Sequence, residues 1–154
     1  MSTSTLAVSA IQNGSVIDHI PAGSAVRLLK LLQLKTHPNT VTIGLNLPSK
    51  SMGKKDLLKI EGRFLTTNEI HEIAIFAPNA TINLIHNFKL KDKFTATLPE
   101  AIKGLLVCPN KNCVSVNKDI VSNFEIQTLR QVVQLHCHYC EGVFQKEDIK
   151  EYTR

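Results

Sequence analysis

The hydrophobic positions in the first hundred residues alternate between the spacing of strands and the spacing of helices. The stretch 24–34 predicts a helix with one buried face, because apolar residues recur three and four apart, at Ala25, Leu28, Leu29 and Leu32. A second helix is predicted over 66–77, where Thr66 and Glu69 have the spacing of a capping box. Segments rich in β-forming residues predict strands at 6–11, 15–20, 41–47, 57–62 and 80–90.

These elements follow one another in the order of a split βαβ unit: strands, a helix, two strands, a helix and a strand. Three prolines lie where elements are expected to end, at Pro21, Pro48 and Pro78. The predicted fold is therefore α+β, with a ferredoxin-like (split βαβ) domain over residues 1–100.

Residues 101–154 have a different pattern and form a second predicted domain, which begins near the stretch 97–104. Apolar stretches at 115–127 and 130–140 predict short antiparallel strands. A unit of about fifty residues buries too little apolar surface to be stable alone, and such units usually contain a metal ion or disulfides.

All four cysteines of the chain lie in this second domain. Cys108 and Cys113 enclose a four-residue turn, and Cys137 and Cys140 enclose a two-residue turn. Two short turns that each bring two sulfurs together suit a tetrahedral ion with Zn–S distances of about 2.3 Å. The second spacing and the separation of the pairs are close to those of zinc ribbons. We therefore predict one structural zinc ion per chain, in a small all-β domain of the zinc-ribbon or rubredoxin-like type.

Three other roles are open to these cysteines: buried core thiols, disulfides and a redox pair. Disulfides are rare in the cytosol, and the C-x-x-C pair does not open a helix after a strand, as a redox pair would. His136 and His138 flank the second pair and could replace a thiolate. Four sulfurs around one ion leave no position for an activated water, so the site is predicted to stabilise folding and not to catalyse.

The composition limits the class of protein. An apolar fraction of 43% and a charged fraction of 20% are typical of a soluble globular protein. No apolar run is long enough to cross a membrane, and the first twenty residues lack the pattern of a secretory signal, so we expect a cytoplasmic protein without a membrane partner.

The net charge of +5 raises the question of nucleic acid. Residues 1–100 contain 11 Lys and Arg against 7 Asp and Glu, whereas residues 101–154 contain 7 against 6. The basic excess therefore lies outside the cysteine-containing segment, which weakens the interpretation of that segment as a nucleic-acid-binding ribbon.

The first domain contains no phosphate-binding glycine loop and no nucleophile elbow, which argues against an enzyme. It does contain polar side chains attached to predicted strands: Asp18, His19, Lys59, Asn83 and Lys93. If they meet at one end of a sheet face, two lysines and a histidine near one carboxylate would suit a phosphorylated ligand with a sugar hydroxyl. Scattered surface charges are the alternative.

Several segments together resemble the regulatory chain of aspartate carbamoyltransferase, in the order of that family and over essentially the whole chain. They are "VIDHIPAG", "TIGLNLPS", "MGKKDLLKIE", "FAPNATIN", "LPE", "LLVCPNKNC" and "CHYCE". The resemblance implies a non-catalytic subunit of pyrimidine biosynthesis that binds CTP, UTP and ATP, pairs with a second regulatory chain and modulates catalytic chains. Residues 1–100 would be the nucleotide-binding allosteric domain, and residues 101–154 the zinc domain that docks the catalytic chain.

The resemblance also implies roles for individual residues. Backbone groups of Ala10, Ile11 and Phe88 would read the base. Asp18 would accept hydrogen bonds from the ribose, Lys59 would contact ribose and base, and His19 and Lys93 would face the phosphates. The remaining side chains would line the site: Val16, Asn83, Ile85 and Leu90. Lys55 would lie near a second nucleotide, with Mg²⁺ as its companion ion.

At the interface with the catalytic chain, three residues match the family: Asn110, Asn112 and Glu141. Four positions depart from the family pattern: Ser9 and Phe88 in the nucleotide-binding domain, and Leu129 and Gly142 at the interface. Arg130 could substitute for the basic residue that is expected at 129. The alternative function is a stand-alone zinc-ribbon nucleic-acid-binding protein, which would need basic and aromatic residues around the ribbon.

Overall fold

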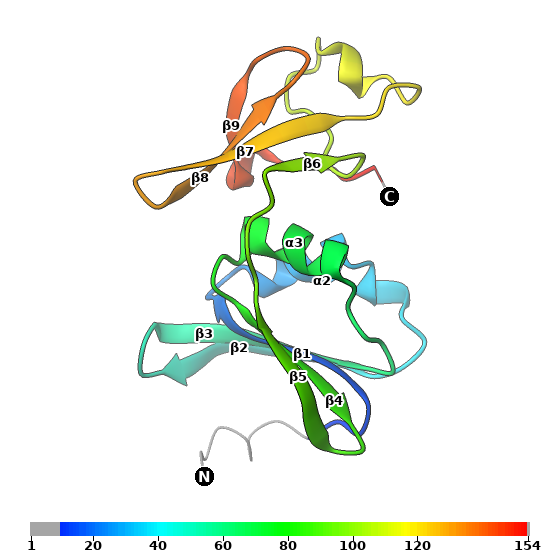
Figure 1. The fold of residues 1–154 in the computed structure, drawn as a ribbon, viewed down its shortest axis with the longest axis vertical. Coiled ribbons are helices and arrows are strands. Elements are labelled where there is room, and N and C mark those ends of the chain that lie inside the picture. The colour runs from blue at the N-terminus through cyan, green and yellow to red at the C-terminus, as the bar shows by residue number, and fades with distance from the viewer. Residues whose placement is uncertain (1–9, 154) are drawn as a thin grey trace. The chain divides into compact units, whose positions relative to one another are not determined.

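The computed structural model describes residues 10–153, which form two compact units. One unit ends at Thr97 and the other begins at Leu98. Each contains its own antiparallel sheet (Figure 1). None of the helices in residues 10–153 is long and apolar enough to cross a membrane.

The first unit contains five strands and two α-helices in the described residues. In chain order they are β1 (Gly14–Pro21), α2 (Ala25–Leu31), β2 (Val41–Ser49), β3 (Gly53–Glu61), α3 (Thr67–Phe76), β4 (Thr81–His86) and β5 (Lys89–Thr95), with a 3-10 turn at Leu34–Thr36 after α2.

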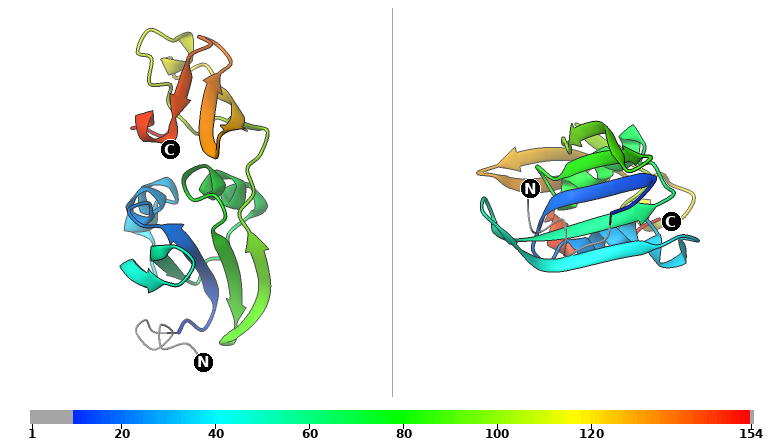
Figure 2. Two further views of the ribbon diagram at one scale, coloured as in Figure 1. Left: turned by 90° about the vertical axis from the view of Figure 1, so that its left-hand side faces the viewer. Right: turned by 90° about the horizontal axis from the view of Figure 1, so that it is seen from below.

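The spatial order of these strands is β2-β3-β1-β4-β5, and each neighbouring pair is antiparallel. The first four strands in this order form the predicted split βαβ sheet, to which β5 adds an edge. Both helices lie on one face of the sheet, and among the described residues no helix lies on the other face (Figures 1 and 2). The core lies between sheet and helices, where Ile17, Leu58 and Ile82 of the sheet and Leu28 and Ile73 of the helices have no exposed surface.

Helix α3 begins as predicted. The Thr66 hydroxyl accepts a hydrogen bond from the Glu69 amide at 3.2 Å, and the Glu69 carboxylate accepts one from the Thr66 amide at 3.0 Å. This capping box satisfies two of the amides that a helix leaves without partners at its start. Arg63 holds the same carboxylate and donates to the carbonyl of Leu32, so it ties α3 to the end of α2.

Helix α2 is shorter than the predicted range, and its start is held from another strand. Asp56 of β3 is fully buried and accepts hydrogen bonds from the amides of Gly23 and Ala25 near the start of α2, and from the amide of Asn46 in β2. Sequence reasoning did not identify this anchor. The predicted apolar stripe is correct for three of its residues, but Leu29 is only half-buried and Leu31 is fully buried.

The prediction of one strand over 80–90 was wrong. His86 pairs with Lys89, so this stretch belongs to a β4–β5 hairpin with a two-residue turn. Asn87 and Phe88 in the turn have φ values of 50° and 65°, as a type I′ turn requires. Phenylalanine rarely adopts a positive φ, so the usual Asn-Gly signal for this turn was absent.

Two strand boundaries also differ from the prediction. Strand β3 begins at Gly53 rather than Leu57, and β2 continues through Pro48. Because β2 is an edge strand, the missing amide of a proline is tolerated there. In the predicted strand 6–11, residues 6–9 lie outside the described residues, and Ala10 and Ile11 are not in a strand.

The second unit is the predicted small all-β domain. Its sheet has the order β6 (Ala101–Lys103), β7 (Asn123–Leu129), β8 (Val132–Cys137) and β9 (Val143–Gln145). Phe124 and Leu135 form its fully buried centre. Strand β8 lies within the second predicted stretch, and β7 begins in the first stretch but continues past its end at Gln127 to Leu129. Strands β6 and β9 have only three residues each, too few for a periodic pattern.

Candidate functional site

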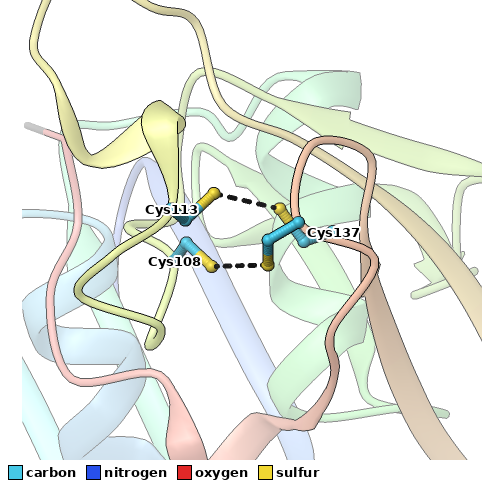
Figure 3. Close-up of side chains that lie close together, drawn as sticks. Cys108, Cys113 and Cys137 are labelled. Carbon is cyan, nitrogen blue, oxygen red and sulfur yellow. Dashed lines mark hydrogen bonds between the residues drawn. The ribbon is translucent and has the colours of Figure 1, made fainter.

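The four cysteines of the second unit converge on one point. Cys108 and Cys113 lie on the loop between β6 and β7, Cys137 ends β8, and Cys140 lies on the turn before β9. Their four sulfurs lie within 4.8 Å of one another, with Cys108 and Cys140 3.8 Å apart and Cys113 and Cys137 3.7 Å apart (Figure 3). These distances are too long for disulfides, and all four cysteines are free.

The same distances suit a tetrahedral metal site. Four sulfurs placed about 2.3 Å from a central ion at tetrahedral angles lie about 3.8 Å from one another. Three of the cysteines are buried and Cys140 is half-buried, so an ion held between them would be shielded from water. The residues present therefore fit a structural metal ion, as the spacing predicted.

Hydrogen bonds around the sulfurs support this arrangement. Burial raises the pKa of Cys108 and of Cys137, although the Asn110 amide donates to the first sulfur and the amides of Cys140 and Tyr139 donate to the second. Burial acts on Cys113 too, but there the hydrogen bonds of Ser115, together with those of the Cys137 and Cys108 sulfurs, outweigh it and lower the pKa to about 7. The Ser115 hydroxyl, itself buried, lies 3.0 Å from the Cys113 sulfur. Sequence reasoning had not identified Ser115.

The polar residues predicted in the first unit meet on the face of its sheet that carries no helix, here called the open face. Strand register places Lys59 of β3 opposite Val16 of β1, Val16 opposite Asn83 of β4, and Asn83 opposite Lys93 of β5. Paired residues of neighbouring strands point to the same side of a sheet. These four residues therefore form one row across the open face.

A β-bulge places Asp18 and His19 beside this row. In β1 both residues stand opposite the single residue Leu57 of β3, and His19 has a φ of 57°. Such bulges redirect side chains and are common next to functional sites. Nδ1 of the His19 ring lies 2.9 Å from the Thr81 hydroxyl oxygen. The His19 amide donates to the Asp18 carboxylate at 2.7 Å.

Asp18 forms an ion pair that sequence reasoning did not predict. The Lys55 ammonium lies 2.9 Å from Oδ1 and 3.2 Å from Oδ2 of Asp18. Both side chains are largely shielded from water, with 13% of Lys55 and 20% of Asp18 exposed. Lys59 lies on the same face, where burial lowers its pKa and the attraction of Asp18 raises it in part.

A small apolar cluster lies beside these charges. Ile11, Val16 and Leu57 are buried in it, with Leu47 and Ile85 packed against them. Two of its members, Leu47 and Leu57, were not among the predicted site residues. Both leucines lie in predicted strands, where side chains alternate between the two faces of the sheet. That alternation could have placed them on the same face as the polar residues.

The β4–β5 turn is tied to the segment that precedes β1. The Phe88 amide donates to the carbonyl of Gln12 at 2.9 Å, and the Asn87 amide donates to the side chain of Asn13 at 3.0 Å. These bonds hold the predicted backbone groups of Ile11 and Phe88 on segments that are fixed to each other. The Phe88 side chain is 65% exposed, and Leu90 is exposed opposite Ile85.

Comparison with known proteins matches two family models to this chain. Residues 6–97 match the allosteric domain of the aspartate carbamoyltransferase regulatory chain, and residues 100–150 match the metal-binding domain of the same chain. The chain belongs to the aspartate carbamoyltransferase regulatory chain family. This membership decides between the two functions considered from the sequence, in favour of the regulatory chain.

Individual relatives of the regulatory chain family are similar over nearly their full length. The regulatory chain of Chromobacterium violaceum is 46% identical over 147 residues, which cover 96% of this chain and 97% of the relative. That of Tolumonas auensis is 47% identical over 146 residues, or 95% of each chain. That of Sodalis glossinidius is 47% identical over 144 residues, or 94% of each.

The three residues predicted to contact the catalytic chain lie on or next to the two cysteine turns. Asn110, Asn112 and Glu141 are all exposed. Asn110 shapes the first cysteine turn, because its side chain accepts from the Asn112 amide and its carbonyl accepts from the Cys113 amide, each at 3.0 Å. Glu141 follows the second turn with a φ of 62° and donates its amide to the Cys137 carbonyl at 3.0 Å.

The residues predicted to depart from the family pattern have different structural settings. Leu129 is 57% exposed at the end of β7, next to Arg130 in the β7–β8 turn. Gly142 has little room, because a Cβ there would come within 2.7 Å of the Phe144 ring. A longer residue at 142 therefore requires that ring to move. Ser9 lies outside the described residues.

Proposed function

We propose that the open face of the first unit is the effector site of this regulatory chain and takes CTP, UTP and ATP. The observation that carries the proposal is the row of Lys59, Val16, Asn83 and Lys93 beside Asp18 and His19. It places cations for phosphates and a carboxylate for sugar hydroxyls next to an apolar cluster, in the part of the chain that matches an allosteric domain.

Asn83 adds a second observation in favour of a polar ligand. Its side-chain oxygen is buried and has no hydrogen-bond partner. A buried acceptor without a partner is costly, and such exceptions in a folded protein are often explained by a ligand or a water that binds there. The oxygen is suited to accept a hydrogen bond from a bound nucleotide.

In this proposal the base is read by backbone groups of Ala10, Ile11 and Phe88, and Ile85, Leu90 and Val16 line the site. Asp18 accepts from the ribose, Lys59 contacts the ribose and the base, and Lys93 and His19 contact the phosphates. Lys55 lies near a second nucleotide, and Mg²⁺ is bound between the two nucleotides. Isothermal titration of the full chain with CTP, UTP and ATP tests the assignment, and wild-type affinity for CTP in the Lys93→Met variant would contradict it.

We propose that the ion of the second unit is Zn²⁺, held by Cys108, Cys113, Cys137 and Cys140. Four thiolates at tetrahedral spacing favour zinc over Mg²⁺ or Ca²⁺, which prefer oxygen ligands. The bound ion would link the two cysteine turns and stabilise the fold without taking part in chemistry. Metal analysis of the purified chain tests this, with one zinc per chain as the expected result.

We propose that the second unit docks the catalytic chain of aspartate carbamoyltransferase and that two regulatory chains pair through their first units. Asn110, Asn112 and Glu141 would make the contacts with the catalytic chain, and Arg130 would supply the basic group that Leu129 lacks. The expected setting is the cytoplasm, consistent with four free thiols. Co-purification with the catalytic chain, followed by titration of its activity with CTP, tests the regulatory role; an unchanged aspartate saturation curve would leave only a structural role.

A further inference from the structure

The ion pair between Asp18 and Lys55 raises a question about how the effector site is entered. Both oxygens of the Asp18 carboxylate contact the Lys55 ammonium, and Oδ1 also accepts the His19 amide. A carboxylate has about four lone-pair positions, so three of them are engaged here. The two adjacent hydroxyls of a ribose need two acceptors, and the carboxylate cannot supply both while Lys55 holds both oxygens.

Displacing Lys55 would leave its ammonium without the partner that it has in this structure. The side chain is only 13% exposed, and a shielded cation without a counter-charge is costly. Its partners across the sheet, Pro21 and Leu47, carry no charge, and Lys59 on the same face of β3 is a further cation. A released Lys55 therefore favours the arrival of an anion.

We propose that Asp18 is transferred from Lys55 to the sugar of an incoming ribonucleoside, so that sugar binding releases Lys55 for a phosphate-bearing group. This inference rests on the proposed effector site and adds to it a coupling between sugar recognition and anion recognition. Lys55 acts here as a positioning residue for Asp18 in the ligand-free chain, and as an anion-binding residue once Asp18 is engaged.

The coupling is measurable with two small probes that separate the sugar from the phosphates. Cytidine carries the ribose and no charge, and inorganic tripolyphosphate carries the charge and no ribose. Because cytidine is neutral, it has no direct charge interaction with tripolyphosphate, and any mutual effect must pass through the protein. Isothermal titration of the full-length chain with each probe, alone and in the presence of the other, gives the coupling factor.

In the wild-type chain we expect saturating cytidine to tighten tripolyphosphate binding about fivefold, and tripolyphosphate to tighten cytidine binding by the same factor, as linkage requires. In Lys55→Met, cytidine should bind tighter than to the wild-type chain and lose its sensitivity to tripolyphosphate. In Asp18→Asn, the coupling should disappear. The matched control is Lys54→Met, which removes the same charge from an exposed neighbour that alternates to the other side of β3, and should keep wild-type coupling.

Equal cytidine affinity in the wild type and in Lys55→Met would overturn the transfer, and so would coupling retained in Asp18→Asn. If CTP still binds in these cases, the proposed effector site remains in place. If the wild-type chain binds neither CTP nor cytidine, both the effector site and the transfer are overturned. A denaturant unfolding curve accompanies each variant. If Lys55→Met does not fold, the coupling factor in Asp18→Asn decides the outcome.

Discussion

Lys59 is half-buried on the open face of β3. Burial lowers its pKa in the folded chain, against the attraction of Asp18. A lysine whose folded-state pKa lies below its unfolded-state value opposes folding while it is charged. This cost is fully present at neutral pH and disappears as the pH rises through the lowered pKa toward the ordinary lysine value of 10.5.

Replacing Lys59 by methionine should therefore separate stability from ligand binding. We expect Lys59→Met to unfold at an equal or higher denaturant concentration than the wild type at pH 7, with the difference shrinking toward pH 10. We expect its affinity for CTP to fall about tenfold or more, because a shielded charge that contacts the ligand is lost. Lys54→Met, at an exposed position, is the control. A destabilised variant with unchanged CTP affinity would contradict both expectations.

Ser115 is the second residue whose role is specific enough to test. Its hydroxyl contacts the Cys113 sulfur, and groups that hydrogen-bond to metal ligands typically contribute about 10–100-fold in metal affinity. We expect Ser115→Ala to lose zinc to a chromophoric chelator at about tenfold lower chelator concentration than the wild type. Ser122→Ala is a matched control, because Ser122 is also a buried serine of the second unit and its hydroxyl has no hydrogen-bond partner. Equal zinc retention in both variants would exclude this role for Ser115.

At the scale of elements, the β-bulge in β1 decides what the open face can bind. If β1 had no bulge between Ile17 and Ile20, its regular alternation would continue, and Asp18 and His19 would point to opposite faces. With it, the carboxylate of Asp18 reaches Lys55 and the imidazole of His19 reaches Thr81. No local sequence pattern predicts this bulge. The one hint is that histidine, like some other polar residues, tolerates a positive φ.

Asp56 gives a test of how the elements of the first unit are held together. Its carboxylate accepts three backbone amides from two other segments, and all three would lose their partner in Asp56→Ala. We expect the free energy of unfolding to fall by about 3–5 kcal/mol, since buried donors left without an acceptor cost about 1–3 kcal/mol each and part of this is recovered by water. Chemical denaturation monitored on the first unit measures it.

Asp92→Ala on the exposed strand β5 is the control for that measurement, and it should change the free energy of unfolding by no more than about 0.5 kcal/mol. An Asp56→Ala variant as stable as this control would show that the three amides find other partners, and that α2 does not depend on the carboxylate for its position.

At the scale of the whole molecule, the two units should respond differently to loss of metal. The second unit has a small buried centre, whereas the first has a complete sheet-and-helix core. Units with so small a core are commonly held together by a bound ion. We expect a strong chelator to collapse the NMR amide dispersion of residues 98–153 while residues 10–97 keep theirs and still bind CTP. Acidification should act in the same direction as chelation, because protons compete with the ion for the thiolates.

The matched comparison is the same titration with a weak magnesium-selective or calcium-selective chelator, which should leave both units folded. Retained amide dispersion of residues 98–153 after complete removal of zinc would contradict a metal-dependent second unit. Loss of both units together would contradict their independence.

The features that could be predicted from the sequence are those set by residues close together in the chain. The capping box of Thr66 and Glu69, the apolar stripe of α2 and the two cysteine turns each depend on spacings of a few residues. Local backbone geometry converts such spacings directly into a shared face or a shared ligand position. The cysteine cluster followed from the last of these spacings, and the order of segments indicated the family.

Only the tertiary structure decided which distant residues meet. The row that joins Lys59, Val16, Asn83 and Lys93 depends on the register of four strands, and a shift of one residue would turn each of these side chains to the other face. The ion pair of Asp18 with Lys55 depends on a bulge, and the anchoring of α2 depends on Asp56 from another strand. These contacts are set by packing of the whole sheet against its helices, which no short stretch of sequence contains.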